Sequence, residues 1–387
     1  MYDVIVAGGG PAGSSAALRA AFRGLKVLLI EKERFPRFKA CAGAVSHRAL
    51  TYLDFAIPDS LREKEIVGLR LCYGGKTLET KNDSPIAVTV TRSFFDEYLL
   101  EKAAEAGASI RTGEKVREVK EEKDCVIVRS TTQSFRSRFA VICEGAHGIL
   151  GKRLGLNVPR RKAALSVTAG VKAPDSVVDD RLPGLLEVHI GLFKKGYCWI
   201  FPHEGYFSVG LWGFEPWLTD LKGTMKRFLQ ENGFPEDIPV RGHLIPAGET
   251  VFFPPASRVI AAGDAGGFVD PLTGEGISFA IRSGQIAADS VADDCTKARG
   301  PAAARFEEAC RREFADKFQY ARMMAEVTYR FPSFFYDLLA GDPDLYRMLL
   351  LAPAMKRLYV DYLLWVFPRL HRSLLLYLKD RLLRSRL

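Results

Sequence analysis

The chain opens with two continuous apolar runs separated by an alanine- and leucine-rich stretch. Residues 4–7 and 27–30 are apolar at every position, which predicts strands buried on both faces, and the segment between them predicts a helix. Residues 92–107 predict a second helix, because their apolar positions recur at helical spacing. Two more apolar runs, at 138–143 and 259–262, predict short buried strands.

The pattern changes in the middle of the chain. From about residue 164 to 250, apolar and polar residues alternate with period two between turn residues, which predicts an inserted antiparallel sheet. Helical periodicity follows Gly276 and continues to about residue 330, and residues 331–387 are aromatic, leucine-rich and basic. We therefore expect an α/β fold, in which a Rossmann-like domain carries an inserted antiparallel β-sheet domain and a helical C-terminal tail.

A glycine-rich loop joins the first predicted strand to the first predicted helix. Gly8 allows the tight turn, Gly10 lets a pyrophosphate approach the backbone, and Gly13 lets the helix pack on the strand. The free amides of the helix N-terminus then face the anion. Glu31 follows Gly13 by 18 residues and ends the second strand, where its carboxylate can accept both hydroxyls of an adenosine ribose. These features in this order predict a dinucleotide site.

A second set of nucleotide signals lies far downstream, which favours a flavin over a nicotinamide cofactor. Asp264 ends the strand at 259–262 and can hold the sugar-like hydroxyls of a long cofactor. A helix that begins near Gly274 and Gly276 directs its positive end and free amides at one place. If that place is the pyrimidine edge of an isoalloxazine, the helix stabilises the anionic reduced flavin.

These motifs, together with Arg92-Ser93-Phe94-Phe95-Asp96, resemble the FAD-binding fold of aromatic hydroxylases of the p-hydroxybenzoate hydroxylase type. Within that fold, the chain is most similar to the geranylgeranyl reductase family in the motifs at 39–43 (Lys-Ala-Cys-Ala-Gly), 196–202 (Gly-Tyr-Cys-Trp-Ile-Phe-Pro) and 242–246 (Gly-His-Leu-Ile-Pro). The resemblance covers roughly residues 1–300 and implies FAD as the cofactor. The residues expected to contact FAD are Gly8, Gly10, Pro11, Ala12, Gly13, Glu31, Lys32, Arg92, Asp264, Gly274, Gly276 and Ile277.

The resemblance also implies a division of the chain into three parts. We expect a discontinuous FAD-binding domain, a substrate-binding β-sheet domain and a C-terminal helical region. Their expected ranges are 1–75, 92–163 and 251–300 for the first, 76–91 and 164–250 for the second, and 301–387 for the third.

One motif departs from the family pattern. After the strand at 138–143 the fold usually has Ala-Asp-Gly-x-x-Ser, whereas this chain has Glu144 in place of the aspartate and Gly148 in place of the serine. A longer acid and a missing hydroxyl imply different local hydrogen bonding. No cofactor contact is therefore carried over to Glu144.

The inserted sheet offers an aromatic wall for a substrate. Along one strand, alternation places Tyr197, Trp199 and Phe201 on the same face, and the returning strand carries Phe207 and Trp212. Aromatic side chains in a row form a large apolar contact surface. Ordinary sheet core is the alternative interpretation of each of them, but the family resemblance favours a lined cavity.

The chemistry of a prenyl chain requires more than a hydride. An isolated prenyl double bond is not electrophilic, so protonation must precede or accompany hydride transfer from the reduced flavin N5. Tyr197 and Trp199 can stabilise the developing positive charge by about 0.5–2 kcal/mol each. Cys41 is the first candidate proton donor and His47 the second. Close packing of a small residue against the flavin ring is the alternative role of Cys41.

Charge and composition limit the partners. The net charge of +9 is concentrated in the tail, since residues 347–387 carry a net +7 and the rest of the chain is nearly neutral, which argues against nucleic-acid binding. The basic tail with its leucine stripe from Leu363 to Leu378 fits an anionic membrane surface, and equally a helix packed on the protein with a solvated charged side.

The cysteines and the apolar runs indicate in which cellular compartment the protein is expected. Seven scattered cysteines without a Cys-x-x-Cys pair predict no disulfide framework, zinc site or iron–sulfur cluster, so we expect no metal. No signal peptide or uncharged apolar run of membrane-spanning length is evident. We expect a cytoplasmic protein, peripheral on the inner face of the membrane if the tail binds lipid.

Together these features predict an FAD-dependent reductase that saturates C=C bonds of a polyprenyl lipid or isoprenoid. The electron donor is left open among NAD(P)H, ferredoxin and other carriers. A flavin-dependent aromatic monooxygenase is the closest alternative. A membrane-associated electron carrier to quinone is the alternative from another class. A flavin halogenase is disfavoured, because the strand at 197–202 lacks that family's Trp-x-Trp-x-Ile-Pro motif.

Overall fold

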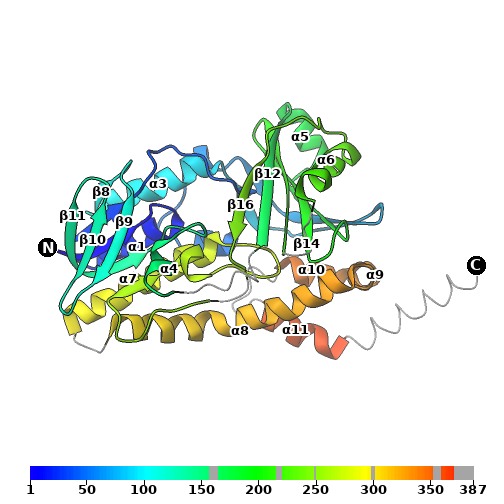
Figure 1. Ribbon diagram of the computed structural model, residues 1–387. Coiled ribbons are helices and arrows are strands. Elements are labelled where there is room, and N and C mark those ends of the chain that lie inside the picture. Colours follow the sequence, from blue (N-terminus) through cyan, green and yellow to red (C-terminus); the bar gives the residue numbers. More distant parts are fainter. Residues whose placement is uncertain (157–163, 215–219, 248–249, 298–300, 352–358, 370–387) are drawn as a thin grey trace, which may run out of the picture.

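The computed structural model describes the chain except for residues 157–163, 215–219, 248–249, 298–300, 352–358 and 370–387. Two large sheets stand side by side, and a long helix runs beneath both of them (Figure 1). This arrangement confirms the expected α/β fold with an inserted sheet and a helical C-terminal region.

The first large sheet is the Rossmann-like part. The two apolar runs at the start of the chain lie next to each other in it as parallel strands, and residues 4–7 and 27–30 are buried or nearly so. The strand order is β8 (Ser109–Arg111), β2 (Val27–Ile30), β1 (Tyr2–Ala7), β11 (Ser134–Ile142), β10 (Val126–Ser130) and β9 (Val116–Glu121), and β17 (Val259–Ala261) pairs with β11.

Helices cover this sheet closely. Helix α1 (Pro11–Phe22) packs between α3 (Arg92–Glu105) and α7 (Ile277–Lys297). Gly284 of α7 explains the short approach to α1, since a Cβ at this position would lie 2.2 Å from the carbonyl oxygen of Ala12. The N-terminal nucleotide motif and the downstream motif are therefore held against each other.

The second large sheet corresponds to the predicted inserted sheet. Its order is β16 (Arg241–Ile245), β12 (Ala164–Lys172), β15 (Tyr206–Phe214), β14 (Gly196–His203), β13 (Leu185–Ile190), β5 (Gly68–Tyr73) and β6 (Lys76–Lys81). All neighbours are antiparallel except β13 and β5, which run parallel. Helices α5 (Asp175–Arg181) and α6 (Leu221–Glu231) pack on the face away from the first sheet's helices (Figure 1).

The expected domain boundary after residue 75 is wrong in this region. It separates β5 from β6, whereas the structure pairs them as a hairpin in the second sheet. The expected assignment of 76–91 to that sheet is also too broad, because β7 (Ala87–Thr89) pairs instead with β3 (Ala44–Ser46) and β4 (Lys64–Ile66). This small third sheet connects the two large ones, beside α2 (His47–Thr51) and the short helix η1 (Asp59–Leu61).

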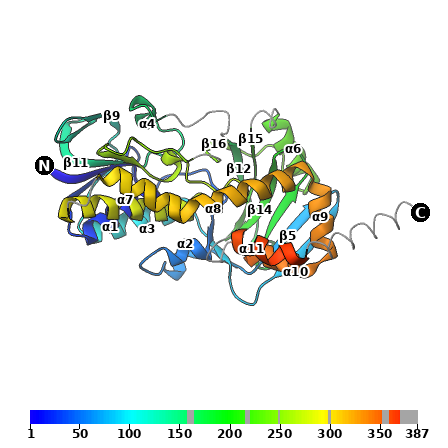
Figure 2. The ribbon, with the colours of Figure 1, turned by 90° about the horizontal axis from the view of Figure 1, so that it is seen from below.

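Helices form the C-terminal region. The long α8 (Ala302–Arg330) is followed by α9 (Pro332–Gly341), α10 (Pro343–Leu351), α11 (Tyr359–Val366) and the short helix η5 (Phe367–Arg369). Seen from below, α10 and α11 lie under the second sheet beside α8 (Figure 2). The rest of the predicted leucine stripe, residues 370–387, lies outside the described residues. Within the part of the chain that the structure describes, no helix has the length and apolarity needed to cross a membrane.

Candidate functional site

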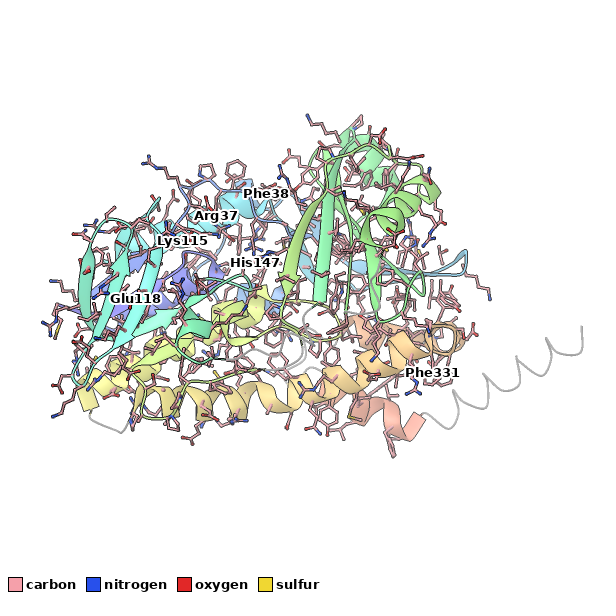
Figure 3. All side chains as sticks on the ribbon, viewed as in Figure 1. Arg37, Phe38, Lys115, Glu118, His147 and Phe331 are labelled. Atoms are coloured by element: carbon pink, nitrogen blue, oxygen red, sulfur yellow. The ribbon has the colours of Figure 1, made fainter. Side chains whose placement is uncertain are left out.

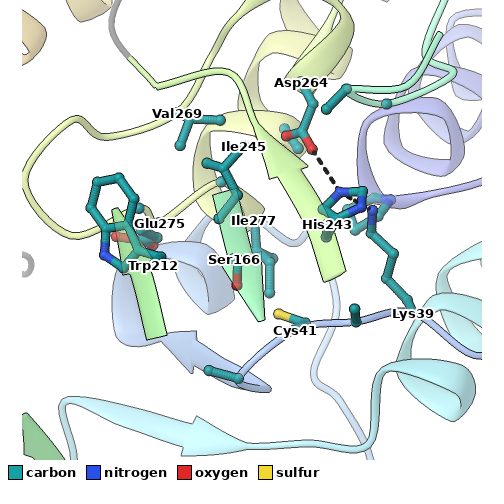
Figure 4. Close-up of a pocket in the computed structure, with 18 of the residues that line it drawn as sticks. Lys39, Cys41, Ser166, Trp212, His243, Ile245, Asp264, Val269, Glu275 and Ile277 are labelled. Carbon is teal, nitrogen blue, oxygen red and sulfur yellow. Dashed lines mark hydrogen bonds and ion pairs between the residues drawn. The ribbon is translucent and has the colours of Figure 1, made fainter. Parts of the chain in front are cut away.

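One large cavity runs from the glycine-rich loop to the C-terminal helices. It has a volume of about 820 Å³, at the upper end of the usual range for ligand sites. Its lining comes from the first sheet, from the loop at 37–46, from one face of the second sheet and from the helices α8–α11. Figure 4 shows part of this lining, where Cys41, His243, Asp264 and Trp212 surround the same space.

The glycine-rich loop forms one end of the cavity. Gly8 has a φ of +111°, and a Cβ there would lie 2.3 Å from the carbonyl oxygen of Cys143. Gly13 packs so closely that its Cβ would lie 1.8 Å from the oxygen of Gly8. Gly13 itself is not part of the lining, whereas Gly8, Gly10, Pro11 and Ala12 are. The turn thus exposes backbone to the cavity in the way a pyrophosphate requires.

Glu31 stands beside this turn at the end of β2. Its side chain is 6% exposed and lines the cavity, as does Lys32. One carboxylate oxygen accepts a hydrogen bond from the amide of Gly9 at 2.6 Å, and the other accepts one from the amide of Glu33 at 2.9 Å. These two bonds hold the carboxylate beside the glycine turn, in the wall of the cavity.

A triad of polar side chains marks the middle of the cavity. The Nζ atom of Lys39 lies 2.6 Å from Nε2 of His243, which in turn lies 4.0 Å from Oδ2 of Asp264 (Figure 4). Burial lowers the pKa of both Lys39 and His243, although Asp264 opposes the shift. Burial would raise the pKa of Asp264, but its interactions with His243 and the nearby Lys39 lower it instead. A carboxylate that stays ionised there can accept hydrogen bonds from cofactor hydroxyls.

Arg92 occupies the first turn of α3 at the cavity wall. It donates two hydrogen bonds to Asp96, at 2.8 and 3.0 Å, and Arg37 donates a third to the same carboxylate at 2.9 Å. Burial disfavours the Arg92 cation, but Asp96 and Cys41 outweigh that effect and raise its pKa. Arg92 is therefore a permanent cation beside Cys41.

The downstream loop closes the cavity against α7. Gly274 has a φ of +69°, and Gly276 and Ile277 also line the cavity at the start of the helix. Asp270 stabilises this loop, because its carboxylate accepts hydrogen bonds from the amides of Leu272 and Thr273 at 2.8 and 2.9 Å. Free amides at the N-terminus of α7 are thus held next to the cavity, as the flavin interpretation expects.

Aromatic side chains of the second sheet form a continuous wall. The register pairs Tyr197 with Trp212, Trp199 with Gly210, and Val188 with Trp199, so alternation places these side chains on one face. The same face continues through Phe201 and lines the cavity. Gly210 gives Trp199 its room, because a Cβ there would lie 2.2 Å from the indole ring.

The expectation that Phe207 belongs to this aromatic wall is wrong. The register pairs it with Pro202, so its ring points to the opposite face of the sheet. There it packs in the core with Phe228 of α6 and, at 5.6 Å between ring centroids, with Phe234. The cavity does not include it.

Of the two candidate proton donors, only Cys41 reaches the cavity. Its thiol lies in the lining and accepts a hydrogen bond from the amide of Gly43 at 3.4 Å. His47 is wrong as a donor, because it begins α2 with its side chain exposed and outside the lining. The neighbouring Ser46 turns into the cavity instead and donates to Glu275 at 2.6 Å.

The two departures from the family motif, Glu144 and Gly148, are linked by steric contact. The carboxylate of Glu144 accepts a hydrogen bond from the amide of Leu150 at 2.5 Å. Its side chain fills the space that a larger residue at 148 would need, since a Cβ there would lie 2.2 Å from Cγ of Glu144. This hydrogen bond holds the Glu144 side chain at the start of α4 (Leu150–Arg153).

Beyond the aromatic wall the cavity becomes an apolar arm that the sequence did not predict. One side is the second sheet, on alternate residues of β5 and β13, and the other side is made by the C-terminal helices. The residues of this apolar arm are Leu69, Leu71, Leu186, Val188, Ile190, Thr328, Tyr329, Phe335, Tyr346, Leu349, Leu350 and Tyr359. Lys39 and His243 were also missed, although each lies inside a motif that the sequence analysis named. Glu275, between Gly274 and Gly276, was missed as well.

The residues present fit FAD. The glycine turn leaves exposed amides at one end, carboxylates at Glu31 and Asp264 are held in place, and helix α7 begins at the far end of the same polar space. Those groups match the pyrophosphate, the hydroxyls and the pyrimidine edge of the cofactor, in this order.

Comparison with known proteins gives a consistent result. A model of the FAD binding domain family matches residues 1–228. The geranylgeranyl diphosphate reductase of Rhodobacter capsulatus is 32% identical over 365 residues, which covers 90% of each chain. A digeranylgeranylglycerophospholipid reductase of Methanopyrus kandleri is 29% identical over 349 residues, covering 84% of this chain and 90% of that protein.

Among solved structures, a geranylgeranyl bacteriochlorophyll reductase-like protein from Thermoplasma acidophilum is similar in fold. The TM-score is 0.76 at 24% sequence identity, and the match covers 84% of this chain and 87% of that chain. The likeness therefore extends well beyond the nucleotide motifs.

Proposed function

Because this chain belongs to the geranylgeranyl reductase family of FAD-dependent oxidoreductases, we propose that it saturates carbon–carbon double bonds in a polyprenyl chain. One observation carries the proposal. The polar space that fits FAD opens directly into the apolar arm, past an aromatic wall, within a single cavity. A long hydrocarbon with several double bonds matches the apolar lining of that arm.

Binding and orientation of the substrate fall to the apolar arm. Leu71, Val188 and Ile190 on the sheet face Tyr329 and Tyr359 on the helices, and these surfaces bury a prenyl chain by the hydrophobic effect. Burial of each methylene contributes about 0.8 kcal/mol, so a chain of several isoprene units gains affinity without polar contacts.

The proposed role of the aromatic wall is to stabilise positive charge on the double bond as it reacts. When bound, FAD supplies the hydride from its reduced N5. Tyr197 and Trp199 present ring faces where positive charge develops on the more substituted carbon. The Tyr197 hydroxyl is held away from this place, since it donates to the carbonyl of Thr273 at 2.5 Å.

Cys41 is the proposed proton donor. It lies in the cavity lining on a loop that also carries Lys39, and Arg92 stands beside it. Delivery of its proton to the less substituted carbon produces the thiolate, which the Arg92 cation stabilises. A Cys41→Ser variant tests this role, because full turnover by that variant would remove the thiol from the mechanism.

We propose the prenyl chain, rather than its polar head, as the recognised part. The relatives are named for substrates with different heads, a diphosphate in one case and a glycerophospholipid in the other. We also place the protein in the cytoplasm at the inner face of the membrane, where such lipids are reached.

Anaerobic turnover with geranylgeranyl diphosphate tests the proposed function. The holoenzyme with dithionite as reductant should give products heavier by two hydrogens for each bond reduced, measured by mass spectrometry. A monooxygenase instead consumes oxygen when an aromatic compound is added and gives a hydroxylated product. Oxygen-dependent hydroxylation without anaerobic reduction would replace the reductase with that alternative.

A further inference from the structure

The C-terminal helices expose a group of large apolar side chains. Met323, Val327 and Phe331 lie on α8 or directly after it, Leu364 lies on α11, and Phe367 lies on η5. These side chains, named the α8–η5 patch, are between 43% and 79% exposed. Exposed apolar groups of this size scattered singly need no explanation, but a gathered set marks an interaction surface.

The patch is one surface because its helices lie together. Residues 323, 327 and 331 are four apart, so they form a single stripe along α8. Helix α11 packs against α8, and both are visible side by side from below (Figure 2). Phe331 marks the end of the α8 stripe, on the same lower side of the molecule (Figure 3).

The inner side of these helices lines the cavity. Thr328 and Tyr329 belong to the same turn of α8 as Val327, yet they are buried and face the apolar arm. Tyr359 of α11 also lines the arm, while Leu364 of the same helix is exposed. One layer of helix therefore separates the patch from the proposed path of the prenyl chain.

Charge around the patch favours an anionic partner. Arg330 is exposed and lies 5.6 Å from the centre of the Phe331 ring. The chain continues from η5 with Arg372, Lys379, Arg381, Arg384 and Arg386 against the single acid Asp380. Aromatic and aliphatic residues bordered by arginine and lysine are typical of helices that lie in the headgroup region of a bilayer.

We propose that the α8–η5 patch docks on a lipid bilayer that contains anionic lipid, and that the prenyl substrate passes from this bilayer into the apolar arm beside Tyr329 and Tyr359. The first part rests on the exposed side chains and their charges. The second part rests on the proposed function.

Vesicle binding tests the docking surface. The full-length holoenzyme should co-sediment with phosphatidylcholine vesicles that contain phosphatidylglycerol, and weakly with phosphatidylcholine alone. The double variant Phe331→Glu, Phe367→Glu should bind the anionic vesicles at least about tenfold less, since it removes two interfacial anchors and adds two negative charges. Phe22→Glu is the matched control, because Phe22 is 77% exposed at the end of α1 and should bind as the wild type does.

Flavin content and activity separate the possible failures. The double variant should keep its FAD and should reduce a detergent-dispersed prenyl substrate as the wild type does, while losing activity on substrate embedded in vesicles. Unchanged vesicle binding by the folded double variant would refute the surface. Loss of a dimer in that variant, measured by light scattering, would instead assign the patch to a second copy. Vesicle binding without reduction of any prenyl substrate would refute the proposed function and leave the surface standing.

Discussion

At the scale of single residues, Gly13 shows how little room the nucleotide turn leaves. Its neighbour across the turn is the carbonyl of Gly8, and even a methyl group at 13 would overlap it. Gly13→Ala should therefore displace the first turn of α1 and lose bound FAD, measured by the absorbance of the purified protein.

Gly341→Ala is the control for this prediction. A Cβ at Gly341 has no atom within 4 Å, so that variant should keep FAD and stability. Full FAD content in Gly13→Ala would show that the turn is looser than the structure has it.

A second prediction concerns the pair of residues that departs from the family motif. Gly148→Ser alone should destabilise the protein by about 1–2 kcal/mol, because the new side chain displaces Glu144 from its hydrogen bond to Leu150. In the background of Glu144→Asp, which shortens the acid, the same serine should cost much less. Urea unfolding of the four proteins in this cycle measures the coupling, and additive effects would contradict it.

A buried contact between His203 and Glu63 supports the loop that carries Cys41. His203 is 1% exposed, and its two ring nitrogens face Oε2 of Glu63 at 2.5 Å and the carbonyl of Ala42 at 2.9 Å. Burial would raise the pKa of Glu63, but the hydrogen bond from His203 lowers it below the ordinary value of 4.5.

This pair predicts a pH dependence of stability. A carboxyl with a depressed folded pKa contributes stability in full above 4.5 and loses it as the pH falls through the folded value. Near neutral pH, Glu63→Gln should be less stable than the wild type by about 2 kcal/mol. That difference should vanish in acid, as measured by urea unfolding from pH 7 downward. A difference that stays constant over this range would contradict the assignment.

At the scale of elements, the period-two pattern predicted the inserted sheet correctly. The expectation that Phe207 lines the cavity was wrong, because it rested on the presence of an aromatic residue and not on its position along the strand. Tyr197, Trp199 and Phe201 alternate along β14, so their common face follows from the sequence. The hairpin register instead decides the face of a residue on β15, and it sets Phe207 opposite Pro202. Phe207 and Trp212 lie five residues apart on β15, so alternation alone places them on opposite faces. The two-residue turn at Glu204-Gly205 then sets the register, and with it the face of each ring.

The apolar arm could not be predicted because it depends on long-range packing. Its sheet side lies on β5, which pairs parallel with β13 more than a hundred residues later. Its helical side comes from residues whose aromatic and leucine-rich pattern is equally typical of ordinary helix packing. Only the assembled structure shows that these two surfaces leave a space between them.

Narrowing this space should change chain-length selectivity. Val188 lies on the sheet side of the arm, and Val188→Trp should block a geranylgeranyl chain while leaving room for a geranyl chain at the aromatic wall. We expect kcat/KM for the longer substrate to fall about tenfold, or about 1.4 kcal/mol, with little change for the shorter one. Val188→Ala should retain both activities. Equal losses on both substrates would contradict the proposed path.

At the scale of the whole molecule, the site joins segments from nearly the full length of the chain. The nucleotide motifs were predictable because each needs a local arrangement of glycine, strand and acid. The structure brings Gly8, Glu31 and Asp264 to the wall of one cavity. The third component, the helices after residue 302, gives the cavity its apolar end. A cofactor domain common to many oxidoreductases thereby gains a space suited to one class of substrate.

A single anaerobic turnover tests the central claim most directly. Holoenzyme reduced by one equivalent of dithionite, freed of excess reductant and mixed with geranylgeranyl diphosphate, should regain its oxidised flavin absorbance as one double bond per FAD is saturated. Flavin that stays reduced while the substrate is recovered unchanged, with the same result for a geranylgeranylated glycerophospholipid, would contradict the account.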